Sequence, residues 1–88
     1  MKFIKLTSLD GKERFIDSEK ILDFGDTRIY YDSVTGDILN HISDLDNEAL
    51  EYWKQKELDC SFINLNTNNG TYRVYVRESL KELLKLLS

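Results

Sequence analysis

Few residues of this chain combine a reactive side chain with a spacing that could support chemistry. His41 is the only histidine and Cys60 the only cysteine among 88 residues, and neither stands at metal-ligand or catalytic spacing from a partner. Ser79 directly follows Glu78, but no base or oxyanion loop accompanies it, so a helix cap explains it better. The sequence therefore predicts no catalytic residue, no cofactor and no enzyme.

Three aspartates are the remaining candidates for a metal site, namely Asp23, Asp26 and Asp32. Carboxylates suit hard cations, but the glutamate that closes the common calcium loop is missing at the required spacing. The glycines form no phosphate-binding loop either, and all of them are expected at turns: Gly11, Gly25, Gly36 and Gly70. We therefore predict no metal site.

Charge is distributed unevenly along the chain, whose formal net charge is −4. Residues 17–59 hold twelve acidic and four basic side chains, whereas 1–16 and 60–88 each hold four basic and two acidic ones. Helical spacing places Asp44, Glu48 and Glu51 away from the apolar stripe of the middle segment. These three are our predicted contacts with a basic partner surface; a purely solubilising role is the alternative.

A second surface combines bases and aromatic rings near the C-terminal end. Arg73, Tyr75 and Arg77 alternate along a predicted strand and therefore share one face. The outer residues of the neighbouring strands would join them: Phe3, Lys5 and Phe62. Such a face could stack bases and bind phosphate, as in an RNA-binding module, although the negative net charge disfavours a polyanionic partner.

The alternative is that a middle helix covers this face. Leu45, Ala49 and Trp53 would then pack on the aromatic rings while the acids of the helix pair with the bases, and the sheet would lie between two helices. We favour this arrangement because Trp53 otherwise lacks a core. Replacing Trp53 with Ala should then cost about 3 kcal/mol or more.

The strands that must position these residues follow from alternating polarity and Gly-containing turns. They are predicted at 3–7, 12–17, 27–32, 60–66 and 71–77. Hairpin turns are expected at Asp10-Gly11 and Asn69-Gly70, with a further turn at 33–37. Residues 18–22 fit either a helical turn or a continuing strand.

Two amphipathic helices complete the predicted fold. The C-terminal one carries a leucine stripe, and Leu83→Ala or Leu84→Ala should each cost about 2 to 4 kcal/mol. The middle one, of three or four turns, has its apolar stripe at Ile42, Leu45, Ala49, Tyr52 and Trp53, with Ser43, Asp44 or Asp46 as its cap.

The expected fold class is α+β: one small domain over residues 1–88, with an antiparallel sheet of four or five strands, a C-terminal amphipathic helix and a helix in the acidic insertion at about 25–59. A chain of this size has little core to spare for an enclosed active site. Its single cysteine, and the lack of a signal-peptide pattern or long apolar run, predict a cytoplasmic protein without a membrane span.

Both ends of the chain resemble a known family. The stretches FIKLTSLDGKERFID with the following EKI, and NNGTYRVYVRESLKELLKLL, resemble the small FlbD-like proteins of flagellar and swarming motility. Asp10 stands where that family usually has Asn, and the acidic insertion stands where it has a few residues. The resemblance implies the fold of the two ends and a role near flagellar assembly or the motor.

The sequence thus leaves two classes of function open. One is a small non-enzymatic regulator or adaptor that binds one larger protein with a basic surface. The other is a mobile-element inhibitor, of the phage type, that blocks a host nucleic-acid-binding or defence protein by mimicking nucleic acid. Neighbouring genes would separate them, and RNA binding is the less favoured third hypothesis.

Overall fold

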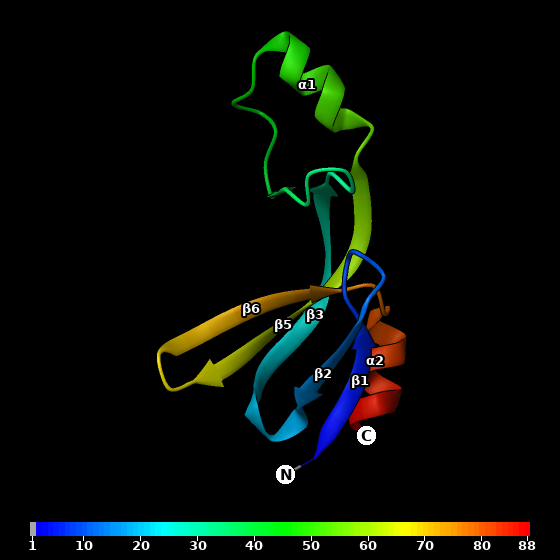
Figure 1. The fold of residues 1–88 in the computed structure, drawn as a ribbon, viewed down its shortest axis with the longest axis vertical. Helices are drawn as coiled ribbons and strands as arrows, with labels where there is room; N and C mark the ends of the chain where they lie inside the picture. The colour runs from blue at the N-terminus through cyan, green and yellow to red at the C-terminus, as the bar shows by residue number, and fades with distance from the viewer. Residues whose placement is uncertain (1) are drawn as a thin grey trace.

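The computed structural model describes residues 2–88, which form two antiparallel sheets and two α-helices (Figure 1). A two-stranded sheet pairs β1 with β2, and a four-stranded sheet has the order β4-β3-β5-β6. The strands are β1 (Phe3–Thr7), β2 (Glu13–Asp17), β3 (Ile21–Tyr31), β4 (Ile38–Leu39), β5 (Glu57–Thr67) and β6 (Gly70–Val76). The helices are the short 3₁₀ turn η1 (Ser18–Lys20), α1 (Asn47–Lys54) and α2 (Leu80–Leu87). The predicted α+β class is confirmed.

Glycines with positive φ close both predicted hairpins. In the β1–β2 turn, Gly11 has φ +88° and its N–H donates to the Ser8 carbonyl at 2.9 Å, as predicted. In the β5–β6 turn, Thr67 pairs with Gly70, whose φ is +112°. Asn68 and Asn69 are therefore the loop, one residue earlier than expected, and Gly70 begins β6.

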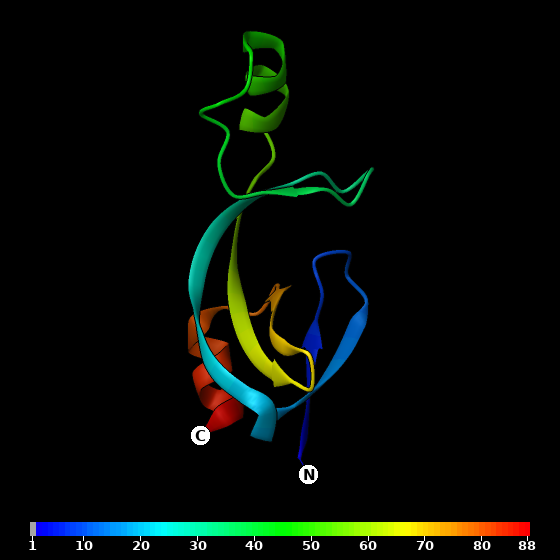
Figure 2. The same ribbon diagram turned by 90° about the vertical axis from the view of Figure 1, so that its left-hand side faces the viewer.

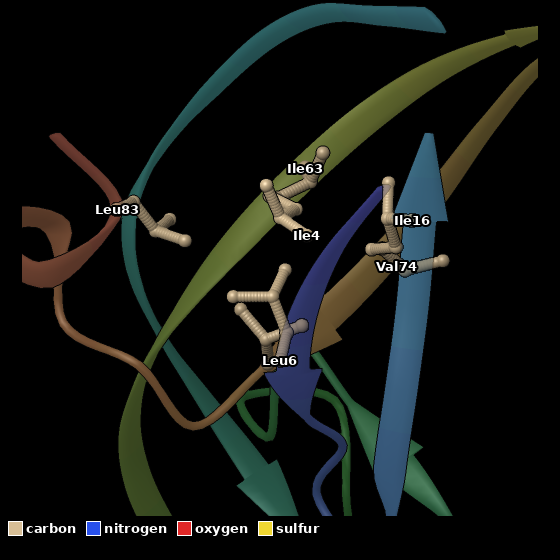
Figure 3. Close-up of a cluster of buried hydrophobic side chains, with 7 residues drawn as sticks. Ile4, Leu6, Ile16, Ile63, Val74 and Leu83 are labelled. Carbon is tan, nitrogen blue, oxygen red and sulfur yellow. The ribbon is translucent and has the colours of Figure 1, made fainter. Parts of the chain in front are cut away.

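The main core lies between the β1–β2 hairpin, the four-stranded sheet and α2 (Figure 3). Alternate strand residues reach it, together with Leu83 of α2, which is fully buried. Leu84 is 54% exposed, so its predicted core role is wrong: it lies at the margin of the stripe. The core residues are Ile4, Leu6, Ile16, Ile63, Val74, Val76 and Leu83.

A smaller cluster occupies the opposite face of the four-stranded sheet. Leu9, Ile29 and Cys60 are buried there, and Tyr31, Leu58 and Tyr75 pack against them. Residues an odd number of positions apart on a strand point to opposite faces. Ile63 of β5 lies in the main core, so Cys60, three positions earlier, faces away from it.

Hydrogen bonds join the hairpin to the end of β6. Arg77 N–H donates to the Thr7 carbonyl at 2.8 Å, beside an isolated bridge between Ser8 and Val76. The Glu78 carboxylate accepts from Thr7 N–H at 2.8 Å and from the Thr7 hydroxyl at 2.9 Å. These contacts close the body of the molecule around its core.

Strands β3 and β5 continue to pair past the last β5–β6 pair, Ser61 with Val76, and form a two-stranded arm there (Figures 1 and 2). Each is eleven residues long, and the molecule measures 47 × 26 × 20 Å. Residues 32–56, which we call the head, lie at the far end of the arm; the body comprises all other residues, those of the arm included. No helix of residues 2–88 combines the length and apolar character that a membrane crossing requires.

The expectation that the middle helix covers the basic and aromatic face is wrong. Helix α1 stands at the far end of the arm, because β3 and β5 pair as far as Tyr30 and Glu57 and carry the segment between them away from β6 (Figure 1). The bases have other partners: the Arg73 guanidinium lies 4.4 Å from the centre of the Phe62 ring, and Lys5 pairs with Glu13 at 3.1 Å. Trp53 is half-buried and outside both hydrophobic clusters.

Gly25 is also placed differently from the expectation, since it lies inside β3 rather than at a turn. It pairs with Phe62 of β5, and a Cβ at this position would come within 3.0 Å of the Phe62 ring. The missing side chain therefore makes room for the aromatic ring on which Arg73 stacks.

Candidate functional site: an acidic head on a two-stranded arm

The head carries the whole net charge of the protein. It contains six acidic and two basic side chains, so its formal charge of −4 equals that of the complete chain, and the body holds ten of each sign. The acidic residues are Asp32, Asp37, Asp44, Asp46, Glu48 and Glu51. An extended arm thus presents a negative tip beyond a body whose charges balance.

The three predicted contact residues all lie in the head and are all exposed. Glu48 and Glu51 stand three positions apart on α1, and Asp44 lies in the loop that leads to this helix. Glu51 pairs with Lys54 at 3.5 Å, with 73% of the Glu51 side chain exposed. Such a pair restrains the carboxylate weakly, so it can exchange Lys54 for a partner's base.

Helix α1 begins later than the sequence suggested. Asp46 is its N-cap and accepts a hydrogen bond from Ala49 N–H at 2.9 Å. Ile42 and Leu45 therefore precede the helix instead of belonging to its stripe, and α1 has eight residues. Of the candidate caps, Asp46 takes the role, which leaves Asp44 in an exposed loop.

A buried carboxylate anchors α1 to the base of the head. The Tyr52 hydroxyl donates to Asp32, which is 1% exposed and also accepts from Val34 N–H at 3.0 Å. The hydrogen bond from Tyr52 lowers the pKa of Asp32, and the same bond raises the pKa of Tyr52. Sequence reasoning missed this pair, because no local pattern connects two residues on separate elements.

The three aspartates considered for a metal site do not form a common site. Asp23 accepts from the Asn64 amide at 2.6 Å, Asp32 is held by Tyr52, and Asp26 lies exposed on β3. Within residues 2–88, no three His, Cys, Asp or Glu side chains are grouped so that they could hold a metal ion.

An open hollow of about 690 Å³ lies beside Cys60 at the start of α2. Burial raises the pKa of the Cys60 thiol to about 11, so the thiol stays protonated and unreactive at neutral pH. Arg77, also in its wall, is occupied, since its Nε–H donates to the Leu9 carbonyl at 2.8 Å. This hollow presents no activated group.

In comparisons with protein-family models, curated proteins and solved structures, the chain has no match. The resemblance of its two ends to FlbD-like proteins therefore stays a hypothesis from the sequence.

Proposed function

We propose that this protein is a small non-enzymatic regulator or adaptor that binds one larger protein through its acidic head. The observation that carries the proposal is the position of the net charge of −4, all of which lies at the end of the arm. The partner would present a basic surface to Asp44, Glu48 and Glu51. A cytoplasmic location belongs to the proposal, since a single buried cysteine suits a reducing compartment.

Electrostatic attraction between head and partner would act mainly on the rate of association. Each exposed ion pair contributes only about 0.2 to 1 kcal/mol. Several acids on one tip add up to a field that steers a basic partner, and salt screens that field. Because the arm holds the head away from the body, a partner can approach α1 without meeting the rest of the molecule (Figure 1).

A nucleic-acid-mimicking inhibitor is the second candidate, and the shape of the molecule favours it. A narrow acidic tip on a molecule 47 Å long could enter a basic cleft that normally holds nucleic acid. Genes for flagellar proteins beside this gene would support the adaptor, which the FlbD-like resemblance suggests. Phage or anti-defence genes would support the inhibitor.

The test compares the parent with the triple variant Asp44→Lys, Glu48→Lys and Glu51→Lys. Partners captured from host lysate by the parent would be identified, and their association rates measured at low and high salt. We expect the triple variant to associate much more slowly at low salt and to differ little at high salt. A partner that binds both proteins equally fast at low salt would disprove the role of the head.

A matched control keeps the change of net charge but moves it to the body. Glu13, Asp23 and Asp26 are exposed acids outside the head, and replacing all three with Lys alters the net charge by the same amount. This control should associate closer to the parent rate than the head variant does. Equal slowing by both variants would mean that total charge matters and the head does not.

A further inference from the structure

Strand β6 ends the four-stranded sheet and leaves most of its outer edge without a neighbouring strand. One side of β6 pairs with β5 from Gly70 to Val76. On the other side the described chain provides only the isolated bridge between Ser8 and Val76. Such an edge is a template for another extended chain.

The direction of the backbone groups along this edge follows from one hydrogen bond. Arg77 N–H points away from β5, because it donates to the Thr7 carbonyl of the hairpin. Successive residues of an antiparallel strand turn their N–H and C=O groups alternately to one side and the other. Thr71 and Arg73 therefore direct their N–H and C=O groups away from β5, as Arg77 does.

A groove of about 460 Å³ runs along this edge. Its walls are the β1–β2 turn, the β3–β4 turn and residues 72–75 of β6. Figure 2 shows both turns extending from the same side of the molecule. A chain that pairs with the backbone of Arg73 would therefore lie between these two turns.

The side chains that line the groove favour an extended peptide with acidic residues. Tyr31, Tyr72 and Tyr75 provide apolar surface with polar tips, and Arg14 and Arg73 provide positive charge. Neither arginine takes part in an ion pair of residues 2–88. Arg73 donates instead to the neutral Asn64 amide at 2.8 Å.

The acid of the groove is already occupied. Asp10 accepts from the Ser8 hydroxyl at 2.7 Å and from Lys12 N–H at 3.0 Å. Its carboxylate stabilises the β1–β2 turn and keeps its negative charge, so with the two arginines the groove has a net charge of +1.

We propose that an extended acidic peptide segment of a partner protein binds in this groove as an additional strand on β6. Its backbone pairs with Thr71 and Arg73, and alternate side chains contact the tyrosines and the guanidinium groups. The groove shares the β3–β4 turn with the head but contains none of Asp44, Glu48 and Glu51, so the two binding sites can be tested independently.

The experiment selects random displayed dodecapeptides against the full chain and measures the affinity of the best binder as a synthetic peptide. We expect enriched peptides to carry acidic residues and to shift the backbone amide signals of residues 70–76 in NMR spectra. N-methylation of the peptide should weaken binding about tenfold at alternate positions and little at the positions between them. The parent and the triple variant Asp44→Lys, Glu48→Lys and Glu51→Lys should bind the selected peptide equally well.

Two variants of the same residue separate backbone from charge. Arg73→Thr keeps the N–H and should weaken an acidic peptide severalfold; Arg73→Pro removes the N–H as well and should abolish binding. If the proline variant fails to fold, the methylation series alone decides. The proposal is overturned if no peptide is enriched, or if binding ignores N-methylation. It is also overturned if these amide signals respond to single-stranded RNA or to self-association and not to peptide.

Discussion

At the scale of single residues, the polar side chains that resembled reactive groups hold the fold together. Ser79 accepts from Glu82 N–H at 3.2 Å as the N-cap of α2, as its position suggested. Glu78 binds both polar groups of Thr7 and so connects β1 to the end of β6. The cap was predictable because it is local; the Glu78–Thr7 contact spans the whole chain and leaves no mark in the sequence.

Removing the Tyr52 hydroxyl should loosen the head in a pH-dependent way. In the parent, the hydrogen bond lowers the folded-state pKa of Asp32 below its ordinary value of 3.8. The hydrogen bond from the neutral Tyr52 hydroxyl to ionised Asp32 therefore stabilises the fold above that value, and this stabilisation is lost as pH falls through the lowered pKa. Tyr52→Phe should melt at a lower temperature than the parent at pH 7, and the difference should shrink in strong acid.

The matched control for this prediction is Tyr72→Phe, since Tyr72 is 52% exposed and the Asp32 carboxylate accepts from the Tyr52 hydroxyl and Val34 N–H, not from Tyr72. Calorimetry or circular dichroism across the pH range would measure both variants. A Tyr52→Phe deficit that stays constant into strong acid would show that Asp32 is not the partner through which the hydroxyl acts.

At the scale of elements, local patterns predicted the hairpin turns and α2, but not the full length of β3. Strand β3 contains Asp23, Gly25 and Asp26, which interrupt the alternation of apolar residues, so only its later part looked like a strand. Its early part forms a strand because it pairs with β5, although its own residues have a low preference for strand structure. Asp44, Glu48 and Glu51 were expected to be exposed, and they are. That they lie far from β6 depends on the β3–β5 arm, which the sequence did not predict.

The two central leucines of α2 should differ sharply when truncated. Leu83 is fully buried in the main core, so Leu83→Ala removes packed methyl groups and should cost about 2 to 5 kcal/mol. Leu84 is 54% exposed, and Leu84→Ala should cost under about 1 kcal/mol. Urea unfolding of both variants measures the contrast. Similar losses at the two positions would mean that α2 is rotated relative to this packing.

Truncation of Trp53 should affect the head and spare the body. The ring is half-buried and meets Tyr52 edge to face at 5.8 Å, outside both hydrophobic clusters. Trp53→Ala should therefore speed amide hydrogen exchange in α1 while exchange in β5 and β6 stays close to the parent's. Faster exchange throughout the sheet would show that Trp53 also stabilises the core of the body.

At the scale of the whole molecule, stability and charge are separated in space. Among residues 2–88, all ten buried hydrophobic residues lie in the body, and the only buried residue of the head is Asp32. The sequence revealed the charge imbalance, because counting needs no structure. It did not reveal that the imbalance sits on a projection, because this depends on the pairing of strands that are distant in the chain.

A headless chain should therefore fold and lose its electrostatic partner. Tyr31 N–H donates to the Lys56 carbonyl at 2.9 Å, so the ends of the arm stand side by side, and Asn-Gly in place of residues 32–55 would close them as a hairpin. The variant keeps every buried hydrophobic residue and should unfold cooperatively, with β5 and β6 protected from hydrogen exchange as in the parent. It should fail to capture the partner that the parent captures. An unfolded headless chain would show that the head supports the body, and a folded one that still binds that partner would move the binding site off the head.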